Sequence, residues 1–288
     1  MKKFIFGLNA IAIIITGIFT FAGCEKEKST DIRPVTAEYK ITEFSTDEVT
    51  FAKIENLAEK HNQYLDEILA NYNLDNDDYQ SEIINNIMNA NLDNATIEQK
   101  EQICSTMMER GYTPTFEDME TAIGQCDALN NKTEILHFIN ALLSETLKCS
   151  SFEEISNEIT SMQNAANEIF NDSDIIFCLS YSELLRKSMY YWLPEELGGN
   201  GFGYSILCYS TPPKPGSQND AHKKVSVAGE AAIADCSALA ISMTYVGISG
   251  LFNPVIGAGT LVGAAVESAA SSAFTAAVTA LKNHKNKK

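Results

Sequence analysis

Apolar residues recur every three or four positions through most of residues 47–192, with polar and charged residues between them. This spacing is that of one face of an α-helix, and no alternating strand pattern interrupts it. The clearest stripe comprises Val49, Phe51, Ile54, Leu57, Ala58, His61, Leu65, Ile68, Leu69 and Tyr72. The pattern therefore predicts an all-α fold with a multi-helix body.

Helix starts are marked by a serine or threonine just before an apolar stripe. In three of them a carboxylate or amide follows three residues later, the spacing of a capping box. These pairs are Thr96 with Gln99, Thr115 with Asp118, and Ser151 with Glu154, and Thr133 and Ser173 open two further predicted helices. Repeated caps and stripes predict a series of consecutive helices.

The segment after Pro194 differs from the helical block. The run from Gly198 to Gly203 is too rich in glycine for a helix and indicates a flexible connection. Residues 204–209 are expected to form a short extended piece, and residues 211–222, rich in proline and polar residues, a linker. The helical body is thus assigned to residues 47–210.

The C-terminal part, residues 223–288, contains a stretch from Cys236 to Val266 without any charged residue. Asn253-Pro254 divides it, so we expect an apolar, Gly/Ala-rich helical hairpin followed by a basic tail. Small residues on one helix stripe let two backbones come close. The residues expected to serve helix packing or membrane contact are Gly257, Gly259, Gly263, Ala265 and Ala269.

Three environments suit this hairpin: the interior of the helical body, a lipid bilayer, or an oligomer interface. Each arm has about the length that spans a bilayer. Paired apolar helices with a tight turn are similar to the hydrophobic hairpins of colicin-type pore formers and some bacteriocins. Alanine, serine and threonine dominate the second arm, which makes insertion less favourable than for a leucine-rich span.

The N-terminus has the order of a secretory signal: basic Met1-Lys2-Lys3, then the apolar run from Phe4 to Phe21. The small residues Ala22 and Gly23 lead into Cys24, an ending that resembles the lipobox of bacterial lipoproteins. The resemblance implies removal of residues 1–23 and diacylation of Cys24 as the mature N-terminus. Residues 24–46 would then be a flexible lipidated tether.

The polar, lysine-rich start of this tether also resembles the surface-export signals of lipoproteins of the Bacteroidetes. The expected location is therefore the cell envelope, at the outer membrane and facing outward. A formal net charge of −17 disfavours nucleic acid and anionic headgroups as partners. The membrane would be reached through the lipid on Cys24, and a protein partner or self-association is left open.

Six further cysteines follow Cys24, and an even number outside the cytoplasm permits three disulfides. They are Cys104, Cys126, Cys149, Cys178, Cys208 and Cys236. Their wide spacing disfavours zinc, and the run Asp75–Asp78 lacks the later ligands of a calcium loop and is expected to cap a helix instead. No metal site, cofactor or catalytic residue is therefore assigned, and the cysteine pairing is left open.

The pairs His61-Asn62 and Leu65-Asp66 resemble a motif of uncharacterised Bacteroidetes lipoproteins. Those proteins also tend to end in an apolar segment containing Ala-Asp, as Ala234-Asp235 and the run 257–265 do here. The resemblance implies no activity. His61 lies on the apolar stripe, which favours a buried structural histidine, although a histidine near Asp66 also suits a general base.

Three functions are therefore considered. The first is a non-enzymatic envelope lipoprotein that acts by binding or structural contact. The second is a membrane-active effector that inserts the hairpin, and the third is a hydrolase-type enzyme that uses His61.

Overall fold

The computed structural model describes residues 48–70, 72–73, 78–92, 95–110, 114–207, 218–246 and 257–285. All regular structure in these residues is helical, which confirms the predicted all-α fold. The predicted signal sequence, the tether and Cys24 lie outside the described residues. Residues 44–288 form one compact unit.

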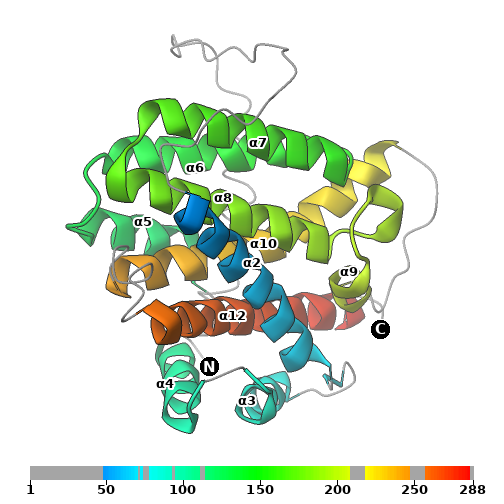
Figure 1. Ribbon diagram of the computed structural model, residues 1–288. Helices are drawn as coiled ribbons and strands as arrows, with labels where there is room; N and C mark the ends of the chain where they lie inside the picture. Colours follow the sequence, from blue (N-terminus) through cyan, green and yellow to red (C-terminus); the bar gives the residue numbers. More distant parts are fainter. Residues whose placement is uncertain are drawn as a thin grey trace. The chain divides into compact units, whose positions relative to one another are not determined.

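The helices follow the chain in the order of their labels in Figure 1. They are α2 (Glu48–Leu69), α3 (Tyr79–Asn89), α4 (Ile97–Arg110), α5 (Phe116–Gln125), α6 (Lys132–Thr146), α7 (Phe152–Ile169), α8 (Asp172–Trp192), the 3₁₀ turn η1 (Glu195–Leu197), α9 (Phe202–Leu207), α10 (Gln218–Val246) and α12 (Gly257–Lys285).

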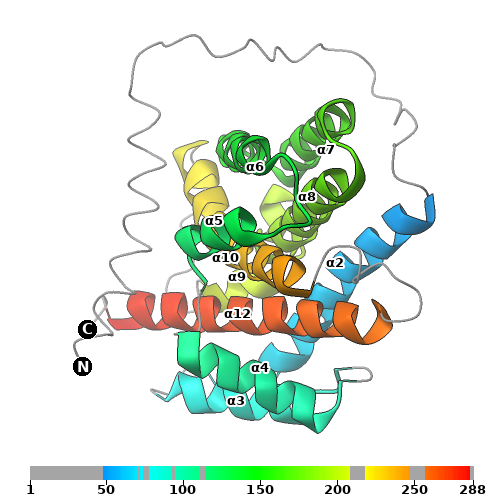
Figure 2. The ribbon, with the colours of Figure 1, turned by 90° about the vertical axis from the view of Figure 1, so that its left-hand side faces the viewer.

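The two long C-terminal helices, α10 and α12, pack against each other and run in opposite directions, as the predicted hairpin requires (Figure 1). Helix α12 also contacts α2, α3 and α4, and α10 contacts α5 and α8. Figure 2 shows α12 between the α3–α4 pair on one side and α10 on the other. The hairpin is thus the central layer of the helical body. Residues before and after the predicted linker, 211–222, belong to one hydrophobic core.

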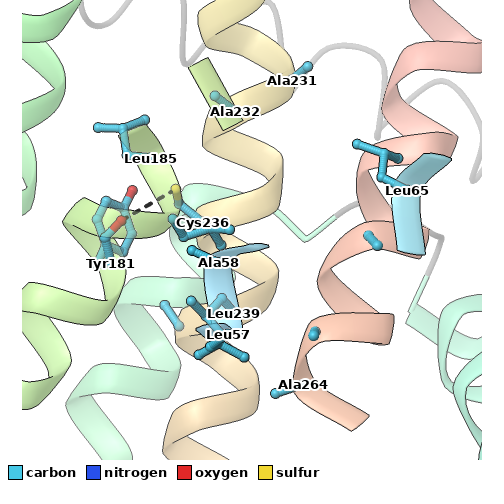
Figure 3. Close-up of a cluster of buried hydrophobic side chains, with 14 of the residues drawn as sticks. Leu57, Ala58, Leu65, Tyr181, Leu185, Ala231, Ala232, Cys236, Leu239 and Ala264 are labelled. Carbon is cyan, nitrogen blue, oxygen red and sulfur yellow. Dashed lines mark hydrogen bonds between the residues drawn. The ribbon is translucent and has the colours of Figure 1, made fainter. Parts of the chain in front are cut away.

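The hairpin contributes many alanines and some larger residues such as Leu239 to the core, and the helices that cover it contribute larger aliphatic residues (Figure 3). Ala232 and Ala264 are buried, as are Leu57 and Leu65 from α2 and Leu185 from α8. Small side chains on α10 and α12 leave room for these larger ones, which fits close packing of helices. The stripe predicted for the first helix faces this core, since Ile54, Leu57, Ala58, Leu65 and Ile68 are all buried.

Most predicted helix starts are confirmed. Thr115 and Asp118 form a full capping box, and Thr96 and Gln99 exchange the same two bonds. The Ser151 side chain accepts from the backbone N–H of Glu154. Asp78 accepts from the N–H of Ser81, so this acidic residue caps a helix as predicted.

Two predicted starts were displaced. Helix α6 begins at Lys132 rather than at Thr133, and α8 begins at Asp172 rather than at Ser173. The start of α6 is capped from a distance, because the buried Asp174 carboxylate accepts from the backbone N–H groups of Asn130 and Asn131. Such a cap from another helix leaves no local sequence signal.

The extended piece predicted at residues 204–209 was wrong, because Phe202–Leu207 forms helix α9. Gly198 and Gly201 adopt positive φ angles of 87° and 78°, which glycine allows without strain. The Asn200 side chain then accepts from the N–H of Phe202 and starts the helix. Helix α10 likewise begins at Gln218, inside the predicted linker; acidic Asp220 suits a first helical turn as well as a loop.

Of the described helices, α10 has a segment long and apolar enough to cross a membrane, Ala221–Thr244. The most apolar window of this segment is 78% buried inside the fold. Core helices of soluble proteins pass the same test of length and composition. The finding is therefore weak evidence for a membrane span.

The glycines of the fold provide a test of the helix packing that we predicted for Gly263. A Cβ atom on Gly263 in α12 would have no neighbour within 4 Å, whereas one on Gly203 would lie 2.5 Å from Trp192 Cε3. We expect Gly263→Ala to raise the free energy of unfolding by about 0.5–1 kcal/mol through higher helix propensity. Gly203→Ala should lower it by about 1–3 kcal/mol through overpacking.

Urea unfolding of both variants measures these changes. Destabilisation by Gly263→Ala would instead support close backbone packing at that position, as the sequence spacing indicated.

Candidate functional site

His61 lies in the middle of α2 with 1% of its side chain exposed. Its Nδ1 is 2.9 Å from Oδ1 of the neighbouring Asn62. The Asn62 amide in turn donates through Nδ2 to the backbone carbonyl of Lys187 in α8, at 3.0 Å. This second bond orients Asn62, and Asn62 orients the imidazole ring.

Asp235 of α10 faces the other side of the ring. Its Oδ1 is 3.5 Å from His61 Nε2, and its side chain is fully buried, with an exposure of 0%. Its Oδ2 accepts hydrogen bonds from the Ser188 hydroxyl and from Trp192 Nε1, the latter at 3.1 Å. Ser188 and Trp192 are one turn apart on α8, so a single face of that helix holds one carboxylate oxygen.

Helix α12 completes this arrangement. The Ser268 hydroxyl donates to the backbone carbonyl of Asp235 at 2.7 Å. The site therefore joins α2, α8, α10 and α12, and we call His61, Asn62, Ser188, Trp192, Asp235 and Ser268 the polar junction. Polar contacts require a defined geometry, so the junction fixes how the hairpin sits against α2 and α8.

The carboxylate expected beside His61 was Asp66, and the structure pairs that residue differently. The Asp66 carboxylate lies at the surface and accepts from the Tyr191 hydroxyl at 2.9 Å. Partial burial raises the pKa of Asp66, although the Tyr191 hydrogen bond opposes this. Burial also raises the pKa of Tyr191, and the Asp66 and Asp235 charges add to the shift. The Tyr191 hydroxyl therefore stays protonated as a donor.

The chemistry of the junction is that of a buried histidine–carboxylate pair with a serine nearby. The serine contacts the carboxylate rather than the imidazole, and all three side chains are at most 1% exposed. A nucleophile must lie within hydrogen-bond reach of its base, and a substrate must reach both. His61 is buried in this arrangement, as its place on the apolar stripe indicated.

A second polar network links α7 and α8. The Arg186 guanidinium contacts Glu183 Oε2 at 3.0 Å and Gln163 Oε1 at 2.6 Å. It also donates to the hydroxyls of Ser156 and Thr160, at 2.9 and 3.0 Å. This network holds α7 in register on the outer face of α8. Sequence analysis missed it, because none of these residues stands out from a polar helix face.

The cysteines in the described part of the chain are free thiols. They are Cys104, Cys126, Cys149, Cys178 and Cys236, while Cys208 lies outside the described residues. Burial and nearby carboxylates raise the pKa of Cys149 to about 11, and burial raises the pKa of Cys178 and Cys236 further above the ordinary value. Such thiols are poor nucleophiles at neutral pH.

The residues predicted for helix packing fall on α12, where Ala265 and Ala269 are buried in the core. Gly257 and Gly259 lie in the first turn of this helix and Gly263 one turn later, without a close neighbour. Within the described residues, no three histidine, cysteine or carboxylate side chains lie close enough together to hold a metal ion.

Sequence analysis did not connect Asp235 with His61, although both were noted. A signal for the pair was present: Asp235 directly precedes a long uncharged stretch, and a carboxylate in an apolar helix needs a buried partner. Comparison of the chain with protein-family models, with curated proteins and with solved structures found no match.

Proposed function

We propose that this protein is a lipoprotein of the bacterial cell envelope, anchored through Cys24, whose helical body acts by binding or structural contact rather than by catalysis. The observation that carries the proposal is the signal-like N-terminus that ends in Ala22-Gly23-Cys24. The acidic body gives no attachment to anionic lipid through charge, so a lipid on Cys24 would hold it at the membrane.

Burial of the polar junction supports a non-enzymatic role. A general base must contact its substrate directly or through one water, and the side chains of His61 and Asp235 are at most 1% exposed where α2, α8, α10 and α12 meet. Their hydrogen-bond partners belong to α2, α8 and α12. The exterior of the body is therefore the surface available for a partner.

Replacing Cys24 tests the anchor. We expect Cys24→Ala to prevent acylation and to move the protein from the membrane fraction to the soluble fraction of cells that carry the lipoprotein pathway. Metabolic labelling with a fatty acid should mark the unsubstituted protein and leave the variant unlabelled. Cys149→Ala is the matched control, and it should keep both the label and the membrane fraction. Labelling of Cys24→Ala, or membrane association of this variant after removal of residues 1–23, would contradict the proposal.

The central position of the hairpin favours one alternative, a membrane-active effector that releases α10 and α12 into a target bilayer. Helix α10 contains a segment apolar enough to cross a membrane, and other helices pack against both α10 and α12, so the fold holds an apolar hairpin inside the helical body. Insertion would bury Asp235 and several hydroxyls in lipid, which is costly.

Leakage of a dye from liposomes separates the two proposals. For the non-enzymatic lipoprotein we expect no leakage with the Cys24→Ala protein between pH 4 and pH 8. Leakage that depends on protein concentration would support the effector.

A further inference from the structure

The hydrogen bonds of His61 determine which ring nitrogen carries a proton. Asn62 Nδ2 donates to the Lys187 carbonyl, and the opposite amide orientation would place Oδ1 against that carbonyl, two acceptors together. Oδ1 of Asn62 therefore faces His61 Nδ1, at 2.9 Å, and Nδ1 must donate to it. The proton on Nδ1 is thus set by the fold.

A neutral imidazole with its proton on Nδ1 has a lone pair on Nε2. That nitrogen faces Asp235 Oδ1 at 3.5 Å, and within the described residues neither atom has a hydrogen-bond partner. A lone pair against a carboxylate oxygen is unfavourable in a buried site. One additional proton between Nε2 and Oδ1 removes the conflict, either as imidazolium with carboxylate or as imidazole with carboxylic acid.

We propose that His61 and Asp235 form a buried proton-binding site, which holds one shared proton in the folded protein and thereby locks the hairpin to α2 and α8. The remaining carboxylate oxygen already accepts from Ser188 and Trp192, so the shared proton stays on the Oδ1 side. No other group is needed to satisfy the pair.

The other titratable groups around the pair leave this proton in place. From α8, Tyr191 donates to Asp66 of α2, and burial keeps its hydroxyl protonated. From α10, burial and the Asp235 charge raise the pKa of Cys236, so that thiol is neutral. The nearest ammonium on α8, that of Lys187, points to Glu59 at 3.2 Å. Helix α12 presents Ser268, which has no charge.

Holding one proton makes stability depend on pH in a defined way. In an unfolded chain histidine loses its proton near pH 6.5 and aspartate near pH 3.9. Above about pH 6.5 the folded state binds one proton more than the unfolded state, so the pair's contribution falls as pH rises. Between these two values both states hold one proton and the contribution is constant. Below about pH 3.9 the unfolded state gains a second proton and the contribution falls again.

Asp235→Asn is a nearly isosteric test of the shared proton. The side-chain carbonyl of the introduced asparagine can accept from Ser188 and Trp192, and its amide can donate to His61 Nε2, so every group is satisfied without an extra proton. In this variant the contribution of the substituted pair to the free energy of unfolding should be constant above about pH 6.5. Below about pH 6.5 it should fall, because the histidine gains a proton only in the unfolded state.

The measurement is urea unfolding of the full chain, in detergent if it is acylated, at half-unit steps from pH 5 to pH 8. We divide the folding equilibrium constant of the unsubstituted protein by that of Asp235→Asn. This ratio should fall about tenfold for each unit by which the pH rises from 5 to 8. Titration of all other groups cancels in this ratio. His137→Gln, which removes an exposed histidine on α6, is the matched control and should keep a constant ratio. A constant ratio for Asp235→Asn would overturn the proposal.

Nitrogen-15 NMR of the unsubstituted protein provides a second readout that needs no variant to fold. We expect the His61 ring to show a proton-bound or hydrogen-bonded Nε2 throughout pH 5–8. An Nε2 signal of a free, unprotonated imidazole nitrogen in this range would overturn the proposal, as would a titration of the His61 ring between pH 5 and pH 8.

Discussion

Replacing Asp235 by alanine is expected to lower the free energy of unfolding by about 3–5 kcal/mol, the cost of removing one partner of a buried ionic pair. The truncation leaves the Ser188 hydroxyl and Trp192 Nε1 buried without the oxygen that accepts from both, and it removes the carboxylate that faces His61 Nε2. Each unsatisfied buried group adds to the cost. The effect is large because the lost carboxylate connects α10 to both α2 and α8.

Urea unfolding at pH 6 measures this loss, with Asp235→Asn as the control that keeps the size and the polar contacts of the side chain. The asparagine variant should lose much less than the alanine variant. A loss of under about 1 kcal/mol for Asp235→Ala would contradict the conclusion that the polar junction fixes the hairpin against α2 and α8.

Replacing Arg186 by methionine should lower the free energy of unfolding by about 2–4 kcal/mol. Methionine keeps most of the aliphatic packing but removes the contacts to Glu183 and Gln163. Glu183 is only 5% exposed, so its carboxylate would remain buried without its cation. The estimate lies below that for a fully buried pair because Arg186 itself is 18% exposed.

The adjacent residue supplies the matched control. Lys187 pairs with Glu59, whose side chain is 56% exposed, and surface pairs of this kind contribute less than about 1 kcal/mol. Lys187→Met should therefore change stability little, and it retains the backbone carbonyl that Asn62 contacts. Both variants are measured by urea unfolding in the same buffer. Similar losses in the free energy of unfolding would show that the Arg186 network contributes no more than a surface ion pair.

The acid dependence of the fold connects these stability arguments with the proposed location. A lipoprotein on the outside of a cell meets the pH of its surroundings directly. If the His61–Asp235 pair holds one proton, its contribution to stability is greatest from about pH 4 to pH 6.5 and weakens above this range. The hairpin would then be held most firmly in mildly acidic conditions, which disfavours acid as a trigger for its release.

Much of the local structure was determined by the sequence alone. The stripe from Ile54 to Ile68 predicted the buried face of α2, and the capping pairs at Thr96, Thr115 and Ser151 predicted three helix starts. These signals are readable because they depend on residues within one or two helical turns. The apolar, Gly/Ala-rich character of the C-terminal hairpin was equally plain, and so was the lipobox-like ending at Cys24.

Tertiary structure alone decided which partners these residues have. Asp174 caps a helix 43 residues earlier, and Asp235 rather than the nearby Asp66 meets His61. Sequence proximity favoured Asp66, but on α2 that residue faces the surface, whereas the packing of α10 against α8 brings Asp235 to the imidazole.

The hairpin illustrates the same division. Composition permitted a bilayer, an oligomer interface or a protein core for α10 and α12, because all three environments accept an uncharged helix rich in small residues. Only the covering helices, which supply large side chains for the alanine faces and polar partners for Asp235, make the protein core the environment seen here. The sequence by itself determined the helices and their apolar faces, since these follow from local periodicity, while the pairing of those faces depends on contacts between residues far apart in the chain.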